Sequence, residues 1–155
     1  MTVFRHTTDD DAFIAAPRHE IWRALTDPDL LPRLTPLLRS IRADGDTWRW
    51  EMVRIAALGV AIEPFFTEAM SFTPERRIEF HHAPPAGTRE RTGAEGWYRL
   101  ADADGGTRLS IMLTYSVDLP LPRASGLAVR GVMRTMMDRT GDRFAKNLAQ
   151  HLGVG

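Results

Sequence analysis

Two tyrosines are the side chains of this sequence best suited to orient the polar end of a ligand. Tyr98 and Tyr115 fall on neighbouring predicted strands, each among apolar residues that alternate along its strand. A buried tyrosine hydroxyl usually has a hydrogen-bond partner. In a cavity that partner could be a ligand, whereas at a sheet edge it would be the backbone. Tyr98 and Tyr115 are therefore candidate ligand-binding residues and weak candidates for catalysis.

A pair of histidines, His81 and His82, is the next feature with possible chemistry. Adjacent side chains of a strand face opposite sides, so both imidazoles cannot reach one ion and no metal site is predicted. If Phe80 faces inward, His82 does so too, and its imidazole, with an ordinary pKa of about 6.5, could transfer a proton. The alternative is a solvated strand end, which leaves His82 a weak catalytic candidate.

Glu68 is a carboxylate between two large apolar residues, Phe66 and Met70, at the spacing of one strand face. If all three side chains face inward, the apolar surroundings should raise the pKa of Glu68. However, Pro64 precedes this segment, and proline within a strand is typical of an edge or a bulge. We therefore expect a bulge that turns Glu68 to water.

Composition limits the classes of function. The 155 residues fit one domain, 1–155, with 20 basic and 20 acidic residues and no cysteine. Balanced charge gives no field that would attract nucleic acid, and the absence of cysteine excludes disulfides and thiolate metal sites. There is no apolar run long enough for an integral membrane segment or a signal peptide. No phosphate-binding loop is present, because Gly105-Gly106 marks a hairpin. We expect a cytoplasmic protein without a cofactor.

The segment 125–152 predicts one long helix with an apolar face. The apolar residues recur at offsets of 0, 3, 4, 7, 8, 15, 19 and 23, which is helical spacing. They are Val129, Val132, Met133, Met136, Met137, Phe144, Leu148 and Leu152. Charged residues at every fourth position from Arg130 to Lys146 occupy another face.

Most of the preceding chain predicts strands. A strand at 11–16 is followed by two short helices at 18–26 and 29–34. Alternation then predicts antiparallel strands at 38–42, 47–55, 62–72, 78–82, 91–101 and 107–119. The expected fold class is α+β, with a curved antiparallel sheet of about seven strands that bends around the long terminal helix to bury its apolar face.

Two short motifs and the terminal helix resemble the START-related superfamily of helix-grip proteins, which includes lipid-transfer domains, polyketide cyclases and pollen-allergen-type carriers. The first motif is Ile14-x-Ala16-Pro17-x3-Ile21-Trp22-x2-Leu25-x-Asp27-Pro28, and the second is Gly96-x-Tyr98-x-Leu100 followed by Gly105-Gly106-Thr107-x-Leu109. One departure is Leu34, where family members commonly carry a tryptophan.

The resemblance implies an apolar cavity between the sheet and the long helix. Inward-facing residues of the predicted elements would form its walls, and methionines suit an adaptable pocket. The expected ligand-binding residues are Trp50, Phe66, Phe80, Tyr98, Leu113, Tyr115, Met133, Met136 and Met137. The alternative is that these side chains simply fill a close-packed core.

Three hypotheses of function follow. In the first, the protein binds an apolar or aromatic small molecule or lipid, for transport or sequestration. In the second, it is an enzyme of the polyketide cyclase or dehydrase kind, which would require at least two polar groups converging inside the pocket. In the third, it is an accessory domain that contacts another protein through an exposed apolar patch.

Overall fold

A curved antiparallel sheet and one long helix make up most of the computed structural model, which describes residues 1–155. The main sheet has seven strands in the order β1-β9-β8-β7-β6-β3-β2. These strands are β1 (Thr2–Ile14), β2 (Leu38–Asp44), β3 (Thr47–Met52), β6 (Phe65–Thr73), β7 (Arg77–His82), β8 (Thr92–Ala103) and β9 (Gly106–Leu119). The predicted α+β fold class is confirmed, including its seven-stranded sheet.

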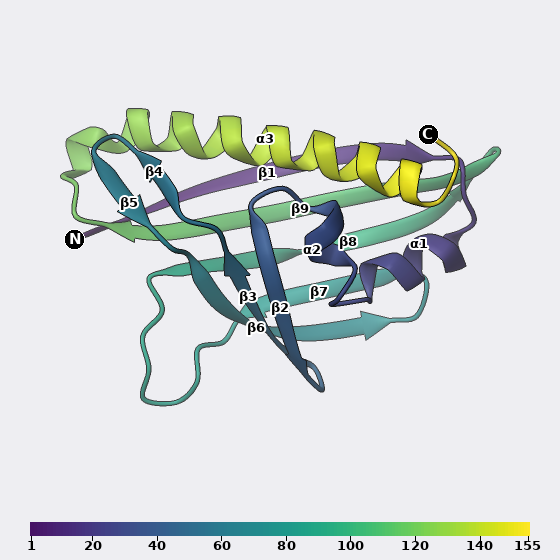
Figure 1. Cartoon of the computed structure of the whole chain (residues 1–155), viewed down its shortest axis with the longest axis horizontal. Coiled ribbons are helices and arrows are strands. Elements are labelled where there is room, and N and C mark those ends of the chain that lie inside the picture. The colour runs from purple at the N-terminus through teal and green to yellow at the C-terminus, as the bar shows by residue number, and fades with distance from the viewer.

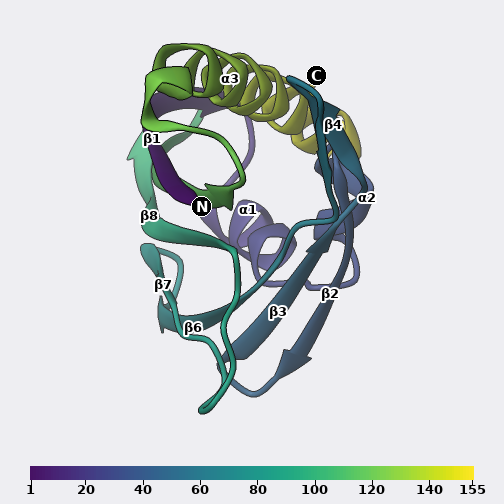
Figure 2. The ribbon, with the colours of Figure 1, turned by 90° about the vertical axis from the view of Figure 1, so that its left-hand side faces the viewer.

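The sheet bends so far that it nearly closes on itself. Seen end-on, the strands run in an arc from β1 on one side through β6 to β2 on the other, and α3 (Gly126–His151) spans the open side (Figure 2). Gly96 is one position where this geometry excludes a side chain, since a Cβ there would lie 1.9 Å from the carbonyl oxygen of Met112 on the paired strand. Glycine therefore allows β8 to approach β9 closely.

β1 is much longer than the strand predicted at 11–16. It begins at Thr2 and pairs with the whole of β9, from Thr2 opposite Leu119 to Ile14 opposite Thr107. The prediction was wrong over 2–10 because most positions on the same strand face as Phe4 are polar, which hides the strand pattern. These positions are Thr2, His6, Thr8 and Asp10. Phe4, which is buried, is the one large apolar anchor of that half.

Two short helices, α1 (Arg18–Leu25) and α2 (Leu31–Leu34), follow β1 as predicted. Between them, the Asp27 carboxylate accepts hydrogen bonds from the backbone N–H groups of Asp29 and Leu30, at 3.0 and 3.1 Å. α2 therefore begins two residues later than the predicted boundary. The carbonyl of Leu34, at its end, accepts a hydrogen bond from the Asn147 amide of α3 at 2.9 Å, which ties this helix to the long one.

A small hairpin, formed by β4 (Ile55–Ala57) and β5 (Val60–Ile62), leaves the main sheet and reaches toward α3 (Figure 1). The sequence predicted strands at 47–55 and 62–72 but not a separate hairpin between them. Leu58 and Gly59 both have positive φ, at 54° and 76°, as such a tight turn requires. Val60 and Ile62 pack against a cluster that includes Val129 of α3, so the hairpin closes one side of the fold.

α3 follows a single 3-10 turn, η1 (Arg123–Ser125), and extends over β1. Its residues Val129, Phe144 and Leu148 are buried, whereas Met133, Met136 and Met137 are only half-buried. None of the helices has a segment of the length and hydropathy that crossing a bilayer would require.

Candidate functional site

A cavity of about 330 Å³ lies between the concave face of the sheet and α3. Hydrophobic residues make up 29 of its 40 lining residues, so its walls are mostly apolar. The space between them is not filled by side chains. Its volume is at the lower end of small-molecule sites, which span roughly 300–1,000 Å³. Of the two expectations for this region, an open cavity or a close-packed core, the structure has the cavity.

The nine residues predicted to bind a ligand all line this cavity, although that they bind one remains a prediction. They are Trp50, Phe66, Phe80, Tyr98, Leu113, Tyr115, Met133, Met136 and Met137. Alternation along the strands places the first six correctly, because successive side chains of a strand face opposite sides, and helical spacing places the three methionines of α3.

Aromatic rings form a continuous part of the wall. Trp50 stacks on Phe66 with ring centroids 6.3 Å apart, and the edge of Tyr115 meets Phe66 at 5.4 Å. Phe80 and Tyr98 form a second contact at 5.5 Å. These pairs have the offset or edge-to-face arrangements that aromatic rings prefer, which fixes the wall and leaves the half-buried methionines of α3 as its adaptable side.

Glu68 is buried inside this wall, and the expectation that a bulge turns it to water is wrong. Its exposed fraction is 1 %, and it lines the cavity. The reason is that Pro64 lies just before β6 and not within it. The strand is therefore uninterrupted from Phe65 onward, and Phe66, Glu68 and Met70 all face inward.

Burial without a counter-charge raises the pKa of Glu68 to about 9. Desolvation is the main cause, and the negative charges of Glu95 and Glu90 add to it, while the backbone N–H of Ala94 opposes it in part. Neither carboxyl oxygen has a regular hydrogen-bond partner in the chain. At neutral pH Glu68 is therefore an uncharged acid that can both donate and accept a hydrogen bond.

Both tyrosines share this apolar environment and remain protonated. Burial and the nearby charge of Glu68 raise the pKa of Tyr98 to about 12. The same causes, with Tyr98 as a further neighbour, raise the pKa of Tyr115 well above its ordinary value. The Tyr115 hydroxyl donates to the sulfur of Met52 at 2.6 Å, not to the backbone.

Four polar side chains lie on the otherwise apolar wall of the cavity, and we call them the polar spot: Trp50, Glu68, Tyr98 and Tyr115. The indole N–H of Trp50 has no hydrogen-bond partner. The spot is uncharged at neutral pH. Sequence reasoning left Glu68 out, although its strand parity with Phe66 and Met70 is the signal that identifies it.

His82 does not face the cavity, so the predicted orientation of its ring is wrong. Pairing between β7 and β8 ends at Phe80 opposite Gly96, and beyond that point the two strands separate. The ring lies against Gly93, and its Nε2 is 3.0 Å from a carboxylate oxygen of Glu90. His82 instead lines an outer groove with His81 and Glu95, which removes the reason for assigning it proton transfer in the cavity. Nowhere do three or more acidic or histidine side chains gather as a metal ion would require.

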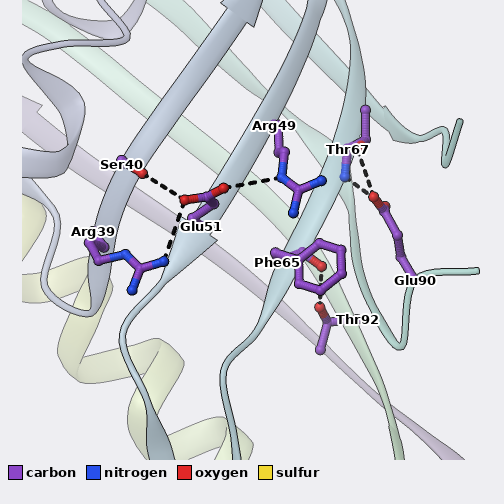
Figure 3. Close-up of polar contacts among 8 residues, drawn as sticks. All are labelled: Arg39, Ser40, Arg49, Glu51, Phe65, Thr67, Glu90 and Thr92. Carbon is purple, nitrogen blue, oxygen red and sulfur yellow. Dashed lines mark hydrogen bonds and ion pairs between the residues drawn. The ribbon is translucent and has the colours of Figure 1, made fainter.

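Glu90 lies in the loop between β7 and β8, and its side chain bonds the part of β6 that extends beyond the end of β7. Its side chain is only 2 % exposed and accepts hydrogen bonds from both the backbone N–H and the hydroxyl of Thr67, each at 2.7 Å (Figure 3). The Thr92 hydroxyl likewise donates to the carbonyl of Phe65 at 2.7 Å. Side chains thus satisfy the backbone groups of β6 that no strand covers. On the outer face nearby, the carboxylate of Glu51 accepts hydrogen bonds from the side chains of Ser40, Arg39 and Arg49 (Figure 3).

Replacing Glu90 by alanine should lower the free energy of unfolding by about 1–3 kcal/mol, because the buried N–H of Thr67 loses its only acceptor. Glu90→Gln should cost much less, since the amide oxygen can still accept from Thr67 and the amide nitrogen can donate to the hydroxyl. Urea denaturation of both variants measures this difference. Equal losses for Glu90→Ala and Glu90→Gln would show that charge, and not the hydrogen bonds at the strand edge, is what matters.

Comparison with known protein families and solved structures identifies proteins that are similar to this chain. The family model described as polyketide cyclase/dehydrase and lipid transport matches residues 5–153. No curated protein matches the chain.

Solved structures share the fold at low sequence identity. TTHA0849 from Thermus thermophilus is 19% identical with a TM-score of 0.70, and the alignment covers 94% of this chain and 95% of that one. The Zhui aromatase/cyclase from Streptomyces sp. R1128 is 14% identical with a TM-score of 0.66, over 95% and 93%. A START superfamily protein from Mycobacterium smegmatis is 18% identical with a TM-score of 0.66, over 94% and 96%. The resemblance to helix-grip proteins is thereby confirmed, and the chain belongs to the polyketide cyclase/dehydrase and lipid transport family.

Proposed function

We propose that this protein binds an apolar or aromatic small molecule in the cavity between the sheet and α3. The observation that carries this proposal is the open space itself, about 330 Å³ with mostly hydrophobic walls. Close-packed protein interiors rarely contain voids larger than a water molecule. A small domain that keeps such a void gives up contacts that would stabilise it, and a ligand would restore them.

The expected affinity follows from the apolar area that the cavity can bury. A bicyclic aromatic molecule that loses ~200 Å² of apolar surface gains roughly 5 kcal/mol at ~25 cal/mol per Å². Contacts with the rings of Trp50, Phe66 and Tyr115 add to this gain, while lost translational freedom opposes it. A net gain of about 5 kcal/mol corresponds to a dissociation constant of roughly 0.2 mM, which is the expected scale for a simple aromatic probe.

A cyclase or dehydrase activity is supported less well by the polar spot. Several polar groups do line one cavity, as such a site would need. However, Glu68 and both tyrosines hold their protons at neutral pH, so the spot offers acids and no ionised base. Abstraction of a proton from carbon requires a base, which the polar spot lacks. The other acidic residues of the lining, Asp10, Asp11 and Asp142, belong to β1 and α3, so the polar spot itself favours binding over catalysis.

Blocking the cavity should abolish binding. Leu113→Trp places a bulky ring in the void from the wall of β9, and we expect the affinity for an uncharged dye such as Nile red to fall at least tenfold, measured by fluorescence titration. Met112→Trp is the matched control, because the adjacent side chain belongs to the outer groove of the sheet. Saturable binding that both variants retain unchanged would place the ligand outside the cavity and refute the proposal.

A further inference from the structure

Three buried polar atoms in the cavity wall lack a hydrogen-bond partner in the chain. They are Nε1 of Trp50 and both carboxyl oxygens of Glu68, which the backbone N–H of Ala94 approaches without the geometry of a regular hydrogen bond. The only other such atom, Oδ1 of Asp118, belongs to a carboxylate that pairs with Arg89 and lies outside the cavity lining. Leaving a buried donor or acceptor unpaired costs about 1–3 kcal/mol. Two such residues on one wall therefore indicate a place where a ligand supplies the missing partners.

The two residues are close enough to contact the same ligand group. Trp50 of β3 is directly opposite Phe66 of β6, and Glu68 is the next inward-facing residue along β6. Such diagonal neighbours have their Cα atoms about 7–8 Å apart, and both side chains are long. The stacked rings of Trp50 and Phe66 hold the indole in place beside this position.

The chemistry of these atoms limits what the ligand can present. An indole N–H only donates, so Trp50 requires an acceptor. Glu68, which holds its proton in these surroundings, offers one donor and one acceptor. None of the 40 lining residues is arginine, lysine or histidine, so nothing would neutralise a carboxylate or phosphate in the cavity. An ammonium group would satisfy Glu68 but would leave the Trp50 N–H unpaired and would have to be desolvated.

Building on the proposed function, we propose that Trp50 and Glu68 form a specificity site that recognises an uncharged acceptor oxygen, such as that of a ketone, quinone or phenol, on the apolar ligand. The Trp50 N–H and the Glu68 O–H both donate to this oxygen. The second oxygen of Glu68 accepts from a ligand hydroxyl where one is present. Tyr98 and Tyr115 complete the polar spot from β8 and β9.

A matched series of naphthalenes tests this site on the full chain by isothermal titration calorimetry at pH 7. The probes are 2-acetylnaphthalene, 2-ethylnaphthalene, 2-naphthoate and 2-(aminomethyl)naphthalene, which share one ring system and differ in a single substituent. The ketone should bind about tenfold more tightly than the ethyl compound, as hydrogen bonds to otherwise unpaired groups predict. Both charged probes should bind more weakly than the ethyl compound.

Variants then assign the preference to the two residues. Glu68→Leu should lower the ratio of ketone to ethyl affinity about threefold while the ethyl compound still binds, and this retained binding shows that the variant is folded. Glu68→Gln keeps a neutral donor and acceptor in the same shape and should preserve the preference. Trp50→Phe keeps the stacked ring without its N–H and should lower the ratio about threefold.

The outcomes separate this inference from the proposed function. Equal binding of the ketone and the ethyl compound would overturn the specificity site but leave the apolar cavity as a binding site. Tightest binding of the aminomethyl compound would overturn it as well, in favour of a cation paired with an ionised Glu68. If no uncharged naphthalene or dye binds, the proposed function fails and the specificity site fails with it.

Discussion

Glu68→Gln should stabilise the protein at pH 7 by about 3 kcal/mol, and the gain should grow with pH. The pKa of Glu68 is about 9 in the folded protein, against 4.5 as the ordinary value of an exposed glutamate. Between these two values the unfolded chain has released the proton while the folded protein still holds it. The stability of the wild type therefore falls by ~1.4 kcal/mol for each pH unit across this window.

Glutamine has no proton to lose, so the difference between variant and wild type isolates this linkage. The difference should be close to zero at pH 4.5 and should approach its maximum near pH 9. Urea denaturation at several pH values measures it. Glu63→Gln is the control, because Glu63 is exposed and is not among the charges that act on Glu68, so it should give little change at any pH. A Glu68→Gln effect that is constant with pH would mean that Glu68 is ionised in the folded protein.

This prediction bears on function, because a buried acid that costs stability is not explained by folding. If packing were the only requirement, a leucine or glutamine at this position of β6 would give the protein a higher free energy of unfolding. Local violations of packing rules are expected mainly at functional sites. The unpaired N–H of Trp50, on the neighbouring strand, is a second violation in the same wall, which is the pattern that a ligand contact produces.

Periodicity in the sequence was sufficient to predict α3, because the pattern extends over many turns. The predicted range 125–152 differs from Gly126–His151 by one residue at each end. The first half of β1 could not be predicted in the same way. Its strand structure depends on pairing with β9, about a hundred residues away, and Asp9, Asp10 and Asp11 carry no apolar alternation. Long-range pairing there overrides local propensity.

The candidate site likewise contains residues that the sequence placed correctly and residues that it did not. Strand parity placed six of the nine predicted wall residues on the cavity, because parity holds wherever a strand is regular, and helical spacing placed the three methionines of α3. The two errors were the bulge expected to turn Glu68 to water and the inward ring expected for His82, and both concern strand ends. Whether Pro64 lies within β6 or before it, and where β7 separates from β8, are decided by neighbouring strands and by the Glu90 side chain. A local sequence window does not contain that information.

The largest stability loss that we expect comes from Leu148→Ala, at about 2–5 kcal/mol, whereas Leu127→Ala should change stability by less than ~0.5 kcal/mol. Both leucines lie on α3, but Leu148 is fully buried in the main core and Leu127 is 85% exposed. The loss from Met136→Ala should fall between these two values, because Met136 borders a space that is already empty.

Thermal or urea denaturation of the three variants tests whether α3 is anchored by its C-terminal half, where Asn147 bonds Leu34, and only loosely held over the cavity. If Met136→Ala costs as much as Leu148→Ala, the methionine half of α3 is packed as tightly as the core, and it cannot be the adaptable side through which the cavity adjusts to a ligand.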